Sequence, residues 1–251
     1  MEKLHRTIAK TAPYRANRTV SVLSKMMALA VKWEMRPDNP ARGVERAPEE
    51  KRERFLTPAE IGRLAEVLAT HKERASCNAI RLMLLTGARR GETLSARWRE
   101  FDLDAGVWVK PSASTKQKKE HRVPLSAPAV ALLLEMRAEV DKDVRRGGEE
   151  PEFVFPGGGG QPLQDIKRVW LSVCRTAGLA KQVEKVGPNG KVVKDTKGEP
   201  VLAWQATARV HDLRHTYCLY PRQLGSIAPG HRCSAGAHPG GDLTALCPSA
   251  G

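Results

Sequence analysis

Apolar side chains recur along one helical face in residues 1–36, which predicts helix there. Pro37 and Pro40 then end the pattern. A single apolar stripe offers too little surface to close a core by itself. We therefore interpret residues 1–44 as the last part of a larger helical domain. The stripe consists of Val20, Leu23, Met27, Ala30 and Val31.

Residues 45–54 are almost all charged and include a proline, which is typical of a linker between domains. Residues 57–60 (Thr-Pro-Ala-Glu) follow, and they combine a capping box with proline at the first helical position. A second domain is therefore predicted to begin at residue 55. The apolar face of its first helix consists of Ile61, Leu64, Val67 and Leu68.

Two more helices are predicted next. The first spans residues 74–85 and ends at Gly87, since glycine readily takes the left-handed conformation that closes a helix. The second begins near Arg90 and carries Leu94 and Trp98 on its apolar face.

The pattern changes after residue 101. Residues 107–109 and 122–125 are short strand candidates, and the polar span 112–120 predicts a β-hairpin with a long basic tip. The chain is therefore predicted to be mainly α with a small antiparallel β-sheet (α+β). The remaining expected elements are a helix at 129–144, a strand at 153–155, a glycine turn at 157–160, a helix at 163–177 and an inserted hairpin at 183–203.

Composition narrows the function to polyanion binding. Lysine and arginine total 42 against 28 acidic residues, a formal net charge of +14. Such an excess favours a nucleic-acid partner. Only 5% of residues are aromatic, which argues against base stacking and favours contacts to the phosphates of a DNA duplex. An RNA-associated protein is disfavoured because no aromatic-studded sheet is predicted.

Other classes of protein are excluded by what the chain lacks. It begins with a polar helix, and no apolar run is long enough to span a bilayer. Its five cysteines have no paired spacing, so we expect a cytoplasmic protein without disulfides or a zinc site. The glycine run at 157–160 lacks the Lys-Ser/Thr of a phosphate-binding P-loop.

Three places carry candidate chemistry. Arg89 follows a helix end, where its planar fork suits a bidentate phosphate contact, although a surface arginine paired with Glu92 is the alternative. A lysine at the hairpin tip, Lys116, is a candidate for DNA contact or proton donation, and an ordinary solvated tip is the alternative. His211 and Arg214 lie one helical turn apart.

These places form three motifs in a fixed order: residues 84–94 (LLTGARRGETL), residues 114–125 with Ser-Thr-Lys and Arg-Val-Pro-Leu, and residues 211–216 (HDLRHT). In these motifs the chain resembles the catalytic domain of the tyrosine recombinases, the phage integrase family. The resemblance runs from about Arg54 to Tyr217. Residues 1–44 resemble the last part of that family's core DNA-binding domain.

The resemblance implies a function. In this family a tyrosine attacks a DNA phosphodiester, leaving a 3′-phosphotyrosyl link and a free 5′-hydroxyl, and the reverse attack rejoins the strand. The partner is duplex DNA at attachment sites, the assembly is a tetramer on DNA, and no cofactor or metal is needed. The resemblance assigns catalysis to Arg89, Lys116, His211 and Arg214, and DNA contact to Lys118, Lys119 and Arg122.

The chain departs from the family after residue 217. The family pattern places a Leu-Gly-His element near residue 237 and a tyrosine near 246, where this sequence has Ala237 and Leu246. Residues 218–251 contain four prolines, six glycines, no lysine and no glutamate, without a helical or strand period. Either an out-of-frame read of a GC-rich gene or a natural disordered tail explains them.

We therefore expect the chain to form no covalent DNA adduct and no family-type tetramer. It is either an inert recombinase domain or a non-catalytic DNA-binding remnant that competes with an intact integrase. Neither of the two tyrosines near the 211–216 motif is expected to act as the nucleophile. Tyr217 is predicted to pack in the core, and Tyr220 precedes a proline and has no predicted scaffold.

Overall fold

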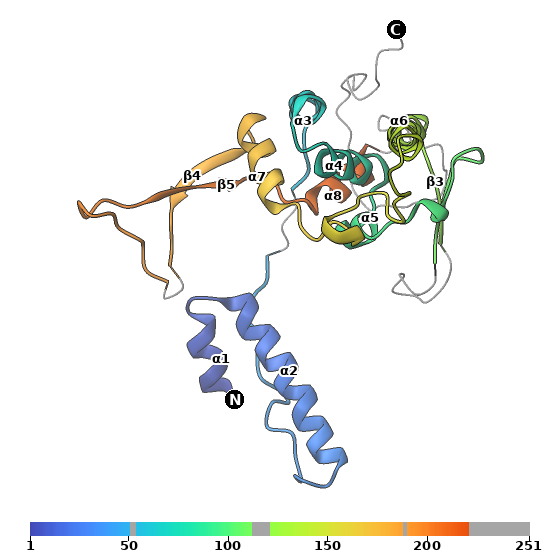
Figure 1. Ribbon diagram of the computed structural model, residues 1–251. Coiled ribbons are helices and arrows are strands. Elements are labelled where there is room, and N and C mark those ends of the chain that lie inside the picture. The colour runs from blue at the N-terminus through green and yellow to red at the C-terminus, as the bar shows by residue number, and fades with distance from the viewer. Residues whose placement is uncertain (51–53, 112–120, 188–189, 221–251) are drawn as a thin grey trace. The chain divides into compact units, whose positions relative to one another are not determined.

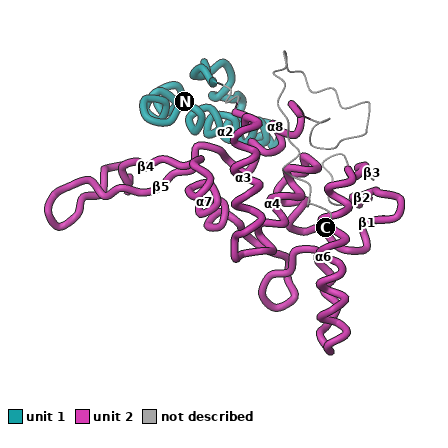
Figure 2. The backbone as a smooth tube through the Cα atoms, turned by 90° about the horizontal axis from the view of Figure 1, so that it is seen from above, with its two compact units in different colours: residues 1–53 teal, residues 54–251 magenta. Residues whose placement is uncertain are grey.

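The chain forms two compact units, Met1–Glu53 and Arg54–Gly251 (Figure 2). The computed structural model describes residues 1–50, 54–111, 121–187 and 190–220. The boundary between the units lies inside the charged stretch that we predicted as a linker.

The first unit contains two helices, α1 (Glu2–Ala9) and α2 (Pro13–Lys32). Asn17 ties the unit together: its Oδ1 lies 2.8 Å from His5 Nε2, and its Nδ2 donates to the backbone oxygen of Ala47 at 2.8 Å. Val20 is buried, but the rest of the predicted stripe remains partly exposed.

The second unit is mainly helical with two small antiparallel sheets, which confirms the predicted fold class (Figure 1). Its helices are α3 (Pro58–Thr70), α4 (Arg74–Thr86), α5 (Arg90–Leu94), α6 (Ala127–Arg145), α7 (Lys167–Thr176) and α8 (Asp212–Leu219), with 3-10 turns at Trp98–Glu100 and Gly158–Gly160. Its strands are β1 (Phe101–Asp102), β2 (Val107–Lys110), β3 (His121–Pro124), β4 (Ala180–Glu184) and β5 (Leu202–Ala206).

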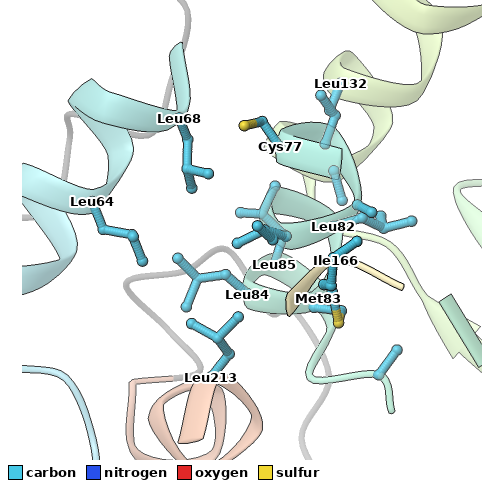
Figure 3. Close-up of a cluster of buried hydrophobic side chains, with 14 of the residues drawn as sticks. Leu64, Leu68, Cys77, Leu82, Met83, Leu84, Leu85, Leu132, Ile166 and Leu213 are labelled. Atoms are coloured by element: carbon cyan, nitrogen blue, oxygen red, sulfur yellow. The ribbon is translucent and has the colours of Figure 1, made fainter. Parts of the chain in front are cut away.

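Helix α4 lies at the centre of this unit. Nearly all of its side chains after the first turn are buried, as expected for a helix covered on every side. Figure 3 shows its leucines packed between α3, α6 and α8. The labelled side chains in that cluster are Leu64, Leu68, Cys77, Leu82, Met83, Leu84, Leu85, Leu132, Ile166 and Leu213.

Both predicted helix-end signals are present. Thr57 Oγ1 accepts from the backbone N–H of Glu60 at 3.3 Å, and the Glu60 carboxylate accepts from the N–H of Thr57 at 2.9 Å, which completes the capping box. Gly87 closes α4 with a φ of 62°, the left-handed conformation predicted for it.

The predicted hairpin is also present. β2 pairs antiparallel with β1 and with β3, and Val109 lies opposite Arg122 in the register. The other predicted hairpin forms a two-stranded ribbon from β4 and β5 that projects away from the helices (Figure 1).

Three expected elements differ from the structure. The helix predicted for 163–177 begins only at Lys167, because Asp165 accepts the N–H of Lys167 and starts the helix there. The helix from Arg90 ends at Leu94, so Trp98 belongs to a separate 3-10 turn. Residues 153–155 form only one isolated bridge, between Phe153 and Arg97, so they are not a strand.

Several predicted features lie outside the described residues. They are the hairpin tip with Lys116, Lys118 and Lys119, the turn at 188–189 and residues 221–251. Among the helices that are described, none is long and apolar enough to cross a membrane. The same part of the chain contains no cluster of three histidine, cysteine, aspartate or glutamate side chains suited to a metal.

Candidate functional site

Helix α8 carries Arg214, is preceded by His211, and packs against α4 (Figure 1). The Nη1 of Arg214 donates a hydrogen bond to the backbone oxygen of Gly87. The Tyr217 ring packs so closely on Gly87 that a Cβ there would lie 2.4 Å from Tyr217 Cδ1. These contacts bring the 211–216 motif against the 84–94 motif, although more than a hundred residues separate them.

The position of α8 is fixed from its other side as well. Thr216 Oγ1 accepts the backbone N–H of Leu56 at 2.9 Å and donates to the backbone oxygen of Asp212 at 2.8 Å. Thr216 and Leu213 are fully buried. The conformation of Arg214 is therefore set by a helix that is anchored in the core.

Arg89 is the residue immediately before α5, and its side chain is 54% exposed. Its Nη1 lies 2.7 Å from Glu92 Oε1, and its backbone N–H donates to Glu92 Oε2 at 3.3 Å. The pairing with Glu92 that we considered as an alternative is thus present. It uses one edge of the guanidinium and leaves the side chain half exposed.

Glu92 also accepts from a buried lysine. Lys110 Nζ lies 2.7 Å from Glu92 Oε2 and 4.1 Å from the centroid of the Trp108 ring. The Lys110 side chain is only 6% exposed and that of Glu92 13%. A single carboxylate therefore holds two cations, one buried and one facing solvent.

Charge and burial compete within this cluster. Burial alone would raise the pKa of Glu92, but hydrogen bonds from Lys110 and Arg89 lower it to about 2. Burial lowers the pKa of Lys110, and the positive charges of Arg214 and Arg89 lower it further, while Glu92 acts in the opposite direction. Glu92 therefore stays ionised between its two cationic partners.

We expect the Glu92 carboxyl to remain ionised down to a pH of about 2 in the folded protein. Because its folded pKa lies below the unfolded value, the stabilisation from this group is complete above about pH 5 and is lost as the pH falls through the folded pKa. The loss should total about 3 kcal/mol. A ¹³C NMR titration of the side-chain carboxyl measures this directly. A midpoint near 4, the ordinary glutamate value, would contradict it.

His211 lies at the start of α8, exposed, with its ring edge-to-face with His215 at 5.1 Å between centroids. Partial desolvation lowers the pKa of His211, and the neighbouring His215, Arg214 and Arg89 lower it further, while Asp212 acts in the opposite direction. The lowered pKa favours the neutral imidazole, which is the form that can accept a proton.

Not every predicted site residue can be placed. Arg122 is exposed on β3, opposite Val109 of β2. The three tip lysines lie outside the described residues. Sequence reasoning missed Lys110 and treated Glu92 only as a competitor for Arg89. A signal for Lys110 existed, because strand alternation puts it on the same face as Trp108.

Tyr217 of α8 packs against the core, and Tyr220, which caps α8, is buried in it. Tyr217 packs on Gly87, as expected. Tyr220 is only 2% exposed and belongs to the hydrophobic core cluster, so our expectation that it lacks a scaffold was wrong. The backbone N–H of Tyr220 donates to the backbone oxygen of Thr216. This hydrogen bond continues the last turn of α8 and directs the Tyr220 ring inward.

The profile of the phage integrase family matches residues 54–220, most of the second unit. The chain belongs to the phage integrase family. This match begins at Arg54, where the second unit begins. It ends at Tyr220, the residue that caps α8.

Curated relatives agree with the family. The integrase of Enterobacteria phage P4 is 27% identical over 218 residues, covering 80% of this chain and 48% of the relative. Prophage integrase IntA of Escherichia coli K12 is 33% identical over 110 residues, covering 43% of this chain and 25% of the relative. The chain therefore spans about half or less of the length of these integrases.

Solved structures of integrases share the fold. A lambda integrase (75–356) dimer bound to a COC′ core site has a TM-score of 0.58 and 19% identity, covering 89% of this chain and 72% of that one. The Tn1549 transposon integrase with transposon right end DNA has a TM-score of 0.60 and 17% identity, covering 87% and 70%.

Proposed function

We propose that this chain binds duplex DNA and that Arg89 and Arg214 contact one phosphate of the backbone. The observation that supports this most directly is the hydrogen bond from Arg214 to Gly87, two residues before Arg89. It brings two guanidiniums of distant motifs to the same loop. A net charge of +14 favours the same partner.

The family role we propose for this site is site-specific DNA recombination by strand breakage and rejoining. Negative charge builds up on the non-bridging phosphate oxygens in the transition state, and two fixed guanidiniums stabilise it without a metal. The lowered pKa of His211 favours the neutral imidazole, which is suited to take the proton of a nucleophile. Lys116 is proposed to give a proton to the leaving 5′-oxygen.

The related structures support duplex DNA as the partner. Lambda integrase has been solved as a dimer on a core site and as a tetramer on a Holliday junction. We extend only the DNA partner to this chain. A tetramer is not part of the proposal, because the sequence after residue 217 departs from the family.

We further propose that the chain itself does not cut DNA. Tyr220 is buried in the core, Tyr217 is partly buried against it, and no tyrosine occurs between residues 221 and 251. A chain that binds attachment sites without cutting them would act as a competitor of an intact integrase. Adding it to an active recombinase should then reduce recombination.

Duplex binding should be salt-dependent and should require both arginines. Arg89→Ala and Arg214→Ala should each weaken binding roughly ten- to hundredfold, because each removes a charge-assisted hydrogen bond. Each should also reduce the slope of log affinity against log salt by about 1. Fluorescence anisotropy with a labelled duplex over a salt series measures both quantities.

Arg145→Ala is the matched control, because Arg145 is an exposed arginine at the end of α6. It should change the affinity by less than either site variant. Equal losses in all three variants would contradict a specific phosphate site.

Incubation with a nicked attachment-site duplex tests the absence of cleavage. We expect no protein–DNA band on a denaturing gel. A band would refute the proposed inactivity, and its loss in Tyr217→Phe or Tyr220→Phe would identify the nucleophile.

A further inference from the structure

Lys110 is a buried lysine in a position that packing alone does not explain. Strand alternation puts it on the same inward face of β2 as Trp108, and both side chains are almost fully buried. Lysine is rarely buried unless its charge is paired. Its partner is Glu92, which also holds Arg89.

The charges in this cluster determine what Arg89 presents to an anion. If Glu92 paired with Arg89 alone, the two charges would cancel and weaken the field at the exposed edge of the guanidinium. Lys110 takes up one carboxylate oxygen at 2.7 Å, so the group of Arg89, Glu92 and Lys110 retains a net charge of +1. Arg214 adds a further positive charge nearby.

We propose that Lys110 is a positioning residue: it neutralises Glu92 from the buried side and so keeps Arg89 available for a DNA phosphate. Lys110 itself does not contact the DNA in this proposal, because its side chain is buried. The inference rests on the proposed phosphate contact of Arg89. In this proposal β2 does more than form part of the basic hairpin, because it also carries the lysine that sets the charge around Arg89.

The test compares a single and a double variant with the wild type. Lys110→Met keeps an apolar stem over Trp108 but leaves Glu92 to Arg89 alone, and duplex affinity should fall about tenfold. Adding Glu92→Gln to Lys110→Met removes the competing carboxylate, so the affinity should return to within about threefold of the wild type. The free energy of unfolding of each variant is measured beside its affinity, and an affinity that changes only as the folded fraction changes would overturn the proposal.

Two further variants separate charge from packing. Lys110→Arg keeps the positive charge and should retain most of the affinity. Lys142→Met removes one exposed positive charge from α6 and should have little effect on affinity. A loss with Lys142→Met equal to that with Lys110→Met would show that net charge alone is responsible and would overturn the proposal.

A readout without DNA distinguishes this inference from the proposed function. With Glu92 left to Arg89 alone, rotation of the Arg89 guanidinium should slow, as measured by ¹⁵N side-chain NMR, and it should quicken again in the double variant. If the wild type binds no duplex, the proposed function fails, and this rotation alone decides the role of Lys110. Unchanged rotation in Lys110→Met would overturn it, as would an affinity equal to that of the wild type.

Discussion

Replacing Glu92 with glutamine should lower the free energy of unfolding by roughly 3–5 kcal/mol. The change keeps the shape of the side chain but removes the negative charge that faces Lys110, whose side chain is only 6% exposed. An ammonium left in that position has lost its counter-ion and has little access to water. Chemical denaturation of the wild type and the variant at neutral pH measures the difference.

Two comparisons show whether the loss comes from the unpaired lysine. Glu150→Gln removes the carboxylate that pairs with Arg137 in an exposed setting, and it should cost about 1 kcal/mol or less. Lys110→Met combined with Glu92→Gln should recover most of the lost stability, since no charge is then left unpaired. A loss below 1 kcal/mol in Glu92→Gln would mean that Lys110 reaches water or loses its proton at little cost.

The helix ends were the features of the fold best predicted from sequence. Thr57 and Glu60 form a capping box within four residues, and Gly87 needs only its own backbone freedom to close α4. Such signals are local, because all of the groups involved lie within a few neighbouring residues. Residues 153–155 were harder to predict, because an apolar run becomes a strand only if a partner lies alongside it, and here only Phe153 is bridged.

The same distinction between local and long-range signals applies to the residues of the site. The two arginines were predicted because each lies in a motif, although nothing local indicated that Arg214 would reach the Gly87 carbonyl. The pair between Lys110 and Glu92 was missed, since its members are 18 residues apart on different elements. The buried face of β2 held the clue, because a lysine there requires a partner of opposite charge.

Gly87 lies in the first motif and contacts two residues of α8, Arg214 and Tyr217. Gly87→Ala should lower the free energy of unfolding by roughly 2–5 kcal/mol, from a left-handed backbone combined with overpacking. The added Cβ would lie 2.4 Å from Tyr217 Cδ1, and the ring belongs to a helix held in the core. Thermal or urea unfolding measures the loss.

Gly178→Ala separates the two causes. Gly178 has a φ of 69°, close to that of Gly87, but the nearest atom to a Cβ there is 3.9 Å away. That variant should therefore show the backbone cost alone, roughly 1–2 kcal/mol. If both variants lose the same stability, the Tyr217 ring moves aside freely and does not fix α8. If Gly87→Ala loses more and also weakens duplex binding while remaining folded, the glycine sets the distance between α8 and the loop of Arg89. The spacing of the two guanidiniums then depends on the absence of a side chain at residue 87.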